Sequence, residues 1–525
     1  MAPYLQLLFG AITLTAIYAV FKSLVFNMHM FQLNGYRFDT HVHWLKKNLS
    51  RYAVEYIVFA LSFTGLIRKE PVMGFCAAAL WIAVFALLPE NRQKPAKKPL
   101  VYTPRVKRMI VTCCVLFAAT FAGAVCCLAS ERKNLAFLVM GLLCALTPWY
   151  VPLANLINKP MEKGINRHYT NDAKRMLKAS PDLDVIGITG SYGKTSVKFY
   201  LYTILRAWTD TLVTPESYNT PMGVVKTIRG SLKATDKIFL CEMGAKWVGD
   251  IKELCDIVHP KHGIITALGD QHLESFGSVE NIIKTKYELA DALPPDGRLY
   301  GNWDNERIRQ NPPKHAFIKY GFREDADYRC FDTVVSANGI AFKVQAPDGS
   351  VTDFETKLLG EHNVLNITGA IAAANGFGMP MADMRLYVRR IEAVPHRMQL
   401  VEKGNCTIID DAFNSNPAGC RAALDTLSKI DGLRILVTPG MVELGGKEEE
   451  LNCEFGREAA ACCDKIFLIG AKQTLPIARG IREAGFPEKD LFVYEDFGEA
   501  MKKIYSIGSE KRKIILLEND LPDNY

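Results

Sequence analysis

Long apolar stretches fill most of the first 153 residues of this 525-residue chain, and they constrain its folding more than any other feature. A segment that spans a bilayer must satisfy its own backbone polar groups, so it forms a helix of about 20 predominantly apolar residues. The second and third stretches are shorter than this, and Glu55 lies within the second. We expect about five transmembrane helices within residues 1–157, at Pro3–Phe26, Tyr52–Ile67, Val72–Leu88, Ile110–Leu128 and Leu135–Leu153.

The charges of the connecting loops predict how these helices are oriented, because Lys and Arg accumulate on the cytoplasmic side of a membrane. The 27–51 loop contains four basic residues, and the 89–109 loop contains seven against the single acid Glu90. The two other connections hold two basic residues each. We therefore expect a multi-pass cell-membrane protein in contact with membrane lipid, with its N-terminus outside and everything after Asn158 in the cytoplasm. The 27–51 loop itself is either an interfacial helix or a plain linker.

The overall composition excludes two classes of protein. The net charge is +7, but the basic residues concentrate beside the apolar stretches, which fits membrane topology and not a nucleic-acid partner. Six of the 14 cysteines lie in apolar stretches and no CxxC pair occurs. A zinc ribbon or a disulfide framework is therefore not expected, and a reducing cytosol is indicated.

A phosphate-binding loop follows the apolar region. Asp184–Ser196 reads DVIGITGSYGKTS, which predicts a buried strand, a glycine-rich turn and the start of a helix. Glycines let backbone N–H groups approach phosphates, and a helix N-terminus adds partial positive charge. Lys194 is placed to reach the β- and γ-phosphates of ATP, and the Thr195 hydroxyl to ligate Mg²⁺. The predicted ATP-binding residues here are Gly190, Ser191, Tyr192, Gly193, Lys194, Thr195 and Ser196.

Two further polar residues follow the next predicted strands. Glu242 ends the strand-like KIFLCEM of Lys237–Met243, and His272 follows the strand expected at Gly263–Leu268. The carboxyl ends of parallel strands meet at one edge of a sheet, where α/β proteins bind their ligands. We expect Glu242 and His272 to approach the same metal ion near the phosphate loop.

Many ordered motifs after the membrane region resemble the Mur ligase family, which joins amino acids or peptides to carboxylates during bacterial cell-wall synthesis. They run in the family's order from about residue 185 to 445, and the closest resemblance is to the members that add D-alanyl-D-alanine. The resembling stretches are GITGSYGKTS, NTPMGV, EMGA, HLESFGSVENIIKTK, GNWDNE, GEHNVLNITGAIAAA, PHRMQ, IDDAFNSNPAG and GMVELG.

The resemblance implies roles for individual residues. It makes Lys194, His272, Lys286 and Arg397 catalytic, and it makes Asn302, His362, Asn363, Arg397 and Asp411 further ATP contacts, with Asp411 on the ribose. The implied magnesium ligands are Thr195, Glu242, His272 and Lys286, the last if carbamylated. The alternative for Lys286 is an ordinary lysine on a solvated helix face. The implied cofactors are ATP and Mg²⁺.

The implied reaction is an ATP-dependent, ADP-forming ligation. A carboxylate of an envelope precursor attacks the γ-phosphate to give an acyl phosphate, and the amine of an amino acid or dipeptide then attacks the acyl carbon. After Arg397 strands and helices alternate, which predicts a Rossmann-like domain without a dinucleotide fingerprint. The expected fold is α/β: a membrane region (1–157), a P-loop parallel-sheet ATPase domain (158–396) and a C-terminal ligase domain (397–525).

Three departures from the family leave the substrates open. Membrane helices replace its N-terminal domain, Gly440 stands where an aspartate is usual, and Leu517–Asp523 reads LENDLPD in place of a Lys-Gly-Ser loop. The leading interpretation is a peptidoglycan-precursor ligase of a bacterial-type cell, acting on a lipid- or nucleotide-linked acceptor. The alternatives are a poly-γ-glutamate synthase-like amide ligase and a non-catalytic ATP-binding membrane scaffold. An isoglutaminyl synthase subunit, which would need a cysteine zinc insert, and a transporter ATPase are less favoured.

Overall fold

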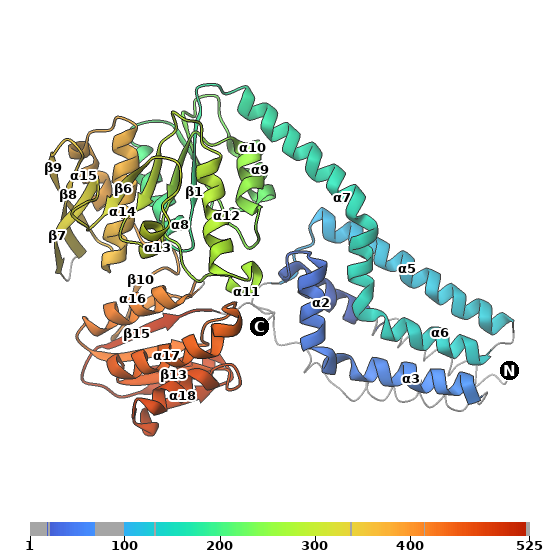
Figure 1. Ribbon diagram of the computed structural model, residues 1–525. Helices are drawn as coiled ribbons and strands as arrows, with labels where there is room; N and C mark the ends of the chain where they lie inside the picture. Colours follow the sequence, from blue (N-terminus) through green and yellow to red (C-terminus); the bar gives the residue numbers. More distant parts are fainter. Residues whose placement is uncertain are drawn as a thin grey trace. The chain divides into compact units, whose positions relative to one another are not determined.

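The computed structural model describes residues 18, 21–68, 99–130, 133–336, 339–413 and 415–520 (Figure 1). The chain divides into two compact units, residues 1–167 with 522–525, and residues 168–521. Two of the five apolar stretches fall wholly or largely outside these ranges. Val72–Leu88 lies wholly, and Pro3–Phe26 largely, outside the described residues.

The described part of the first unit is helical. One helix within it, Pro104–Cys127, is long and apolar enough to cross a membrane, with 24 residues and a mean hydropathy of 2.3. The expectation of about five spans is therefore not confirmed. The apolar part of α3 covers only Glu55–Thr64. Besides the helical residues 21–33, the helices are α2 (Phe38–Lys47), η1 (Leu49–Tyr52), α3 (Ala53–Arg68), α5 (Pro104–Ala129), α6 (Lys133–Ala145) and α7 (Thr147–Lys178), which continues into the second unit.

The fifth predicted span, Leu135–Leu153, is divided between two helices. α6 ends at Ala145 and α7 begins at Thr147, immediately before Pro148. Proline has no backbone N–H and is favoured in the first turn of a helix, where that N–H would have no partner within the helix, so Pro148 favours a new helix start. α7 also packs against α5 through charged groups, since Arg108 donates to both carboxylate oxygens of Glu162 at 2.7 and 2.9 Å.

The phosphate loop follows strand β1 of the larger sheet in the second unit. Among the described residues its strand order is β2-β3-β1-β4-β5-β6-β7-β8-β9, with parallel pairing up to β7 and antiparallel pairing beyond it. The strands are β1 (Asp184–Thr189), β2 (Thr211–Val213), β3 (Ile238–Glu242), β4 (His262–Ile265), β5 (Leu299–Asn302), β6 (Phe317–Gly321), β7 (Tyr328–Ser336), β8 (Gly339–Gln345) and β9 (Val351–Thr356).

Helices cover this sheet and build its core. The fully buried Ile186, Ile188 and Leu240 pack with α8 and α14, while Phe239 and Cys241 belong to a second cluster that includes α10 and α12. The alternation of side chains along a strand sends neighbouring residues to these two clusters. The helices are α8 (Lys194–Leu205), α9 (Pro221–Ser231), α10 (Asp250–Val258), α11 (Leu273–Phe276), α12 (Val279–Asp291), α13 (Glu306–Gln310), α14 (Glu361–Gly376) and α15 (Met381–Arg389).

The second sheet follows Arg397 and is drawn in orange to red in Figure 1. Its described order is β10-β11-β15-β12-β13-β14, parallel except at β10, and the predicted alternation of strands and helices is confirmed. The elements are β10 (Gln399–Lys403), β11 (Cys406–Asp411), α16 (Pro417–Ser428), β12 (Leu433–Thr438), η2 (Gly445–Lys447), α17 (Glu448–Cys462), β13 (Lys465–Ile469), α18 (Leu475–Glu483), η3 (Glu488–Asp490), β14 (Leu491–Tyr494), α19 (Phe497–Ser506) and β15 (Lys513–Glu518).

Candidate functional site

The phosphate loop joins β1 to α8 and needs glycine at two positions. Gly190 has φ +152°, and a Cβ added there would lie 2.1 Å from the Thr266 hydroxyl oxygen. Gly193 has φ +79°, in the left-handed region that glycine adopts without steric cost. The Ser191 hydroxyl donates to the Gly269 carbonyl at 3.1 Å and accepts from the Gly269 N–H at 3.0 Å. The loop is therefore held against the segment that follows β4.

Lys194 lies at the first position of α8, where the sequence predicted it. Its ammonium donates to the carbonyls of Gly190 and Ser191 at 2.6 and 3.0 Å. Burial lowers the pKa of this amine to about 8. Lys194 is thus held within the loop, close to the backbone N–H groups with which a phosphate would interact.

Glu242 ends β3 and receives hydrogen bonds from two neighbouring segments. Thr195 Oγ1 donates to its Oε1 at 3.1 Å, and Asn219 Nδ2 donates to the same oxygen at 3.0 Å. Burial would raise the pKa of this carboxyl, but the charges of Lys198 and Lys194 outweigh it, so the pKa is lowered. An ionised carboxylate beside a hydroxyl is a donor set that fits Mg²⁺, which binds through few protein oxygens together with substrate phosphates.

Lys198 is a residue of this site that the motif analysis did not identify. Its Nζ lies 2.9 Å from Glu242 Oε2, and the two side chains are 0% and 1% exposed. It also donates to the carbonyl of Glu216. The available signal was a lysine four residues after Lys194, on the same face of one helix and among apolar neighbours.

His272 lies at the start of α11, and its side chain contacts Glu443, an acid in the loop after β12. His272 Nδ1 contacts Glu443 Oε2, and Lys246 Nζ lies 2.8 Å from Glu443 Oε1. Burial would raise the pKa of Glu443, but the His272 hydrogen bond and Lys246 lower it to about 2. Within the described ranges no three His, Cys, Asp or Glu residues are grouped to hold a metal. A metal shared by Glu242 and His272 therefore stays a prediction.

Lys286 lies inside the molecule on α12. Its side chain is buried at 3% exposure, and the ammonium lies 5.9 Å from the centre of the Phe276 ring. The alternative of a lysine on a solvated helix face is therefore wrong. Burial lowers its pKa well below the usual value, and the charge of Lys194 adds to the effect. A lowered pKa favours the neutral amine, which is the form that reacts with carbon dioxide.

Among the predicted nucleotide residues Asn302, His362 and Asn363, the two asparagines accept hydrogen bonds from other residues of the protein. Asn302 ends β5, and its Oδ1 accepts from the Asp304 N–H at 3.0 Å. Asn363 lies in the first turn of α14, where its Oδ1 accepts from the Tyr200 hydroxyl at 2.7 Å. Burial lowers the pKa of His362 to about 4, so this imidazole is neutral at physiological pH.

Arg397 links the second sheet to the phosphate loop. Its Nη2 donates to Thr195 Oγ1 at 3.3 Å, and its guanidinium lies 4.8 Å from the centre of the Phe413 ring. Asp411, at the end of β11, accepts from the Met398 N–H at 3.1 Å, and burial raises its pKa to about 6. Arg397 thus joins Thr195, Glu242, Lys194 and Lys198 at one edge of the first sheet.

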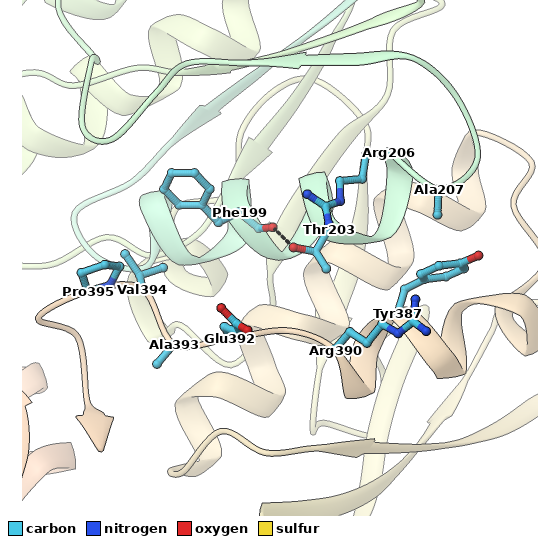
Figure 2. A pocket seen from close by; sticks show the side chains of 10 residues that line it. All are labelled: Phe199, Thr203, Arg206, Ala207, Tyr387, Arg390, Glu392, Ala393, Val394 and Pro395. Atoms are coloured by element: carbon cyan, nitrogen blue, oxygen red, sulfur yellow. Dashed lines mark hydrogen bonds between the residues drawn. The ribbon is translucent and has the colours of Figure 1, made fainter. Parts of the chain in front are cut away.

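A cavity of about 500 Å³ lies farther along the same face of α8 (Figure 2). Phe199 and Thr203, four and eight residues after Thr195, line it together with the segment that precedes Arg397. None of its lining residues is among the predicted nucleotide contacts. The lining residues are Phe199, Thr203, Arg206, Ala207, Tyr387, Arg390, Glu392, Ala393, Val394 and Pro395.

The two C-terminal departures from the family meet at the ends of β12 and β15. Asn519 Nδ2 donates to the Gly440 carbonyl at 2.5 Å. The preceding Glu518 is 1% exposed and accepts from the Ser415 hydroxyl at 2.5 Å and from the Cys420 thiol at 3.2 Å. Burial raises the pKa of Glu518 to about 8. A buried acid therefore lies beside Asp411, its partner in the strand register.

Comparison with known proteins agrees with this architecture. Residues 188–374 match the Mur ligase middle domain, and residues 396–518 match the Mur ligase glutamate ligase domain. The UDP-N-acetylmuramoyl-tripeptide–D-alanyl-D-alanine ligase of Escherichia coli (strain K12) is 31% identical over 308 residues, which cover 57% of this chain and 67% of that protein. The Bacillus subtilis (strain 168) enzyme of the same name is 32% identical over 285 residues, covering 54% and 61%.

Solved structures show the same fold. MurF from Acinetobacter baumannii superimposes with a TM-score of 0.62 at 24% identity, covering 68% of this chain and 77% of that one. MurF from Thermotoga maritima in complex with ADP gives 0.61 at 23% identity, covering 68% and 80%. The chain spans about two thirds of the length of the two curated relatives. It belongs to the Mur ligase family, whose members are ATP-dependent, ADP-forming amide ligases that use Mg²⁺.

Proposed function

We propose that this protein joins the terminal carboxylate of a UDP-N-acetylmuramoyl-tripeptide, or of its lipid-linked equivalent, to D-alanyl-D-alanine. The observation behind this proposal is the convergence of Lys194, Thr195, Glu242 and Arg397 at the phosphate loop. The curated relatives carry this activity in their names. The departures at Gly440 and Glu518 lie in the C-terminal domain, so the amine is the less constrained of the two substrates.

The reaction needs cations because two anions must meet. A carboxylate oxygen attacks the γ-phosphorus, the bond to the β–γ bridging oxygen breaks, and ADP leaves. Lys194 and Arg397 neutralise charge on the phosphates during this step. Magnesium, when bound at Thr195 and Glu242, supplies further positive charge. The amine then attacks the acyl carbon, loses a proton and expels inorganic phosphate.

Lys286 is proposed to act as a carbamate. Burial lowers the pKa of its amine and so favours the neutral form, which adds carbon dioxide and releases a proton. The product is a carboxylate on a long side chain, which is an oxygen ligand suited to a second Mg²⁺. The nearby charge of Lys194, which lowers the pKa of the amine, stabilises this anion.

The N-terminal region is proposed to hold the ligase domains on the cytoplasmic face of the membrane. One support is the Pro104–Cys127 helix, because only 11% of its apolar 18-residue window is buried within the protein. The other is the pair of basic loops, 27–51 and 89–109, that lie on either side of the second and third apolar stretches. A membrane location would bring the enzyme close to a lipid-linked acceptor. After cell lysis, the chain should sediment with membranes and resist extraction by carbonate at high pH. Recovery in the soluble fraction would contradict this part of the proposal.

The function is tested with full-length protein purified in detergent. It is incubated with ATP, Mg²⁺, UDP-N-acetylmuramoyl-tripeptide and a mixture of D-alanyl-D-alanine, glutamate and other amino acids, and the products are identified by mass spectrometry. The expected product is the D-alanyl-D-alanine adduct with one ADP per amide. Successive addition of glutamate would favour the poly-γ-glutamate synthase-like alternative. ATP binding without ADP release under any substrate combination would favour the scaffold.

A further inference from the structure

Glu443, a residue of the C-terminal domain, contacts residues at the carboxyl ends of the strands of the larger sheet. It lies in the loop after β12, and its carboxylate touches two loops that follow successive strands of the other sheet. Oε2 contacts His272 Nδ1, in the loop after β4, and Oε1 lies 2.8 Å from Lys246 Nζ, in the loop after β3. One side chain of the C-terminal domain is thereby linked to both loops that flank the phosphate loop.

The two residues in contact share an uncommon backbone conformation. Glu443 has φ +63° and His272 has φ +57°, in the left-handed region that non-glycine residues seldom adopt. Such conformations persist where surrounding contacts determine them, and they cluster at functional sites. The His272 side chain is only 14% exposed, so its ring is held by its surroundings as well as by Glu443.

The hydrogen bond leaves one ring nitrogen of His272 for another partner. When Nδ1–H donates to a carboxylate, the Nε2 of a neutral imidazole carries the lone pair and can bind a metal. No hydrogen bond to His272 Nε2 occurs among the described residues. In metal sites a carboxylate on the far nitrogen of the histidine fixes the ring orientation and the tautomer, and removing it commonly weakens metal binding 10- to 100-fold.

We propose that Glu443 is a positioning residue that orients His272 toward the metal ion of the ligase reaction. This rests on the proposed function, because the metal is the one that serves ATP and the acceptor carboxylate. Since Glu443 belongs to the C-terminal domain, the orientation of His272 depends on that domain lying against the first sheet. The domain that binds the amine thus also completes the metal site.

A variant of Lys246 can separate a positioning role of Glu443 from a simple ion pair between the two domains. It contacts the same carboxylate as His272, but through the other oxygen, and its side chain is 55% exposed. Removing Lys246 leaves the bond between Glu443 and His272 in place. The variant Lys246→Met is therefore the matched control for Glu443→Ala and Glu443→Gln.

The test is the coordination of Mn²⁺, used in place of Mg²⁺, in the full-length protein with ADP. Electron spin-echo envelope modulation detects a ¹⁴N nucleus bound to Mn²⁺, and a titration gives the Mn²⁺ affinity. We expect ¹⁴N modulation in the wild type and in Lys246→Met, and its loss in His272→Ala. Glu443→Ala should lose most of the modulation and bind Mn²⁺ at least about 10-fold more weakly. Glu443→Gln, which keeps a neutral acceptor, should fall between Glu443→Ala and the wild type.

Two results would overturn the proposal, and neither of them is the result expected if only the proposed function were wrong. Unchanged modulation and Mn²⁺ affinity in Glu443→Ala would reduce Glu443 to an interdomain contact. Absence of ¹⁴N modulation from the wild type would show that His272 does not bind the metal, even if amide formation proceeds. Normal modulation with no amide product would instead retain the positioning role and refute the substrate assignment.

Discussion

Lys198 and Glu242 form an ion pair inside the protein, with 2.9 Å between Nζ and Oε2 and almost no exposure of either side chain. The pair lies directly beneath the phosphate loop, because Thr195 donates to the other oxygen of the same carboxylate. Lys198 therefore compensates the charge of the acid that is expected to serve Mg²⁺. We therefore expect Lys198 to contribute to the stability of the fold as well as to the charge balance of the site.

Removing Lys198 should destabilise the second unit. Lys198→Met leaves a buried carboxylate without its cation, and breaking such a pair typically costs about 3–5 kcal/mol. Thermal unfolding of the purified protein, followed by circular dichroism, should show a clear fall in midpoint. Lys252→Met removes a lysine from the exposed pair with Asp256 and should leave the midpoint nearly unchanged. Equal effects of the two variants would contradict the account.

Lys194 should be indispensable for turnover. Lys194→Ala removes the loop cation that meets the γ-phosphate, and loss of one such donor lowers kcat by about 100- to 1000-fold. ADP release in the presence of acceptor and amine measures the effect. Lys226→Ala on α9 removes an exposed lysine that donates to the Tyr218 hydroxyl, and this variant should retain full activity. Near-normal ADP release by Lys194→Ala would remove the phosphate loop from the mechanism.

Lys286 should be replaceable in part by small carboxylic acids. Lys286→Ala removes the amine that becomes a carbamate and leaves space in its place, so acetate or propionate can supply a carboxylate there. ADP formation by the variant should be low and should rise on addition of these acids. Lys284→Ala, which changes an exposed lysine on the same helix, should be active without them. Failure of every acid to stimulate Lys286→Ala would argue against carbamylation.

Glu518 should make stability fall with rising pH. Its pKa is raised from 4.5 to about 8 in the folded protein, so between these values the unfolded chain releases the proton while the folded chain keeps it. The unfolded state then binds fewer protons, and the free energy of unfolding decreases as pH rises from about 4.5 to 8. Glu518→Gln cannot ionise and should lose less stability across this range. Parallel stability curves for wild type and variant would refute the assignment.

Much of the candidate site at the phosphate loop could be predicted from the sequence, because its residues lie in local motifs. The glycine spacing of Gly190 and Gly193 determines a loop conformation, and that loop fixes Lys194 and Thr195 at the start of a helix. The strand-end position of Glu242 follows from the apolar run before it. Arg397 was identified by the motif around it, and the structure brings it to Thr195.

The residues that escaped prediction depend on contacts distant in sequence. Glu443 is 171 positions from His272, and nothing in its own neighbourhood indicates which loop it touches. Lys198 looks like an ordinary helix residue until the burial of α8 is known. The expected number of membrane helices is not confirmed within the described residues, and at the fifth apolar stretch the reason is local. Hydropathy detects apolar length, but Pro148 divides one apolar run into two helices.

The central claim is that the acceptor carboxylate attacks the γ-phosphorus of ATP. It is tested most directly by labelling the terminal carboxylate of UDP-N-acetylmuramoyl-tripeptide with ¹⁸O and incubating it with the full-length protein, ATP, Mg²⁺ and D-alanyl-D-alanine in unlabelled water. Mass spectrometry of the released phosphate should find one ¹⁸O atom per phosphate, because the phosphate leaves with the carboxylate oxygen. Formation of amide with unlabelled phosphate would contradict the account.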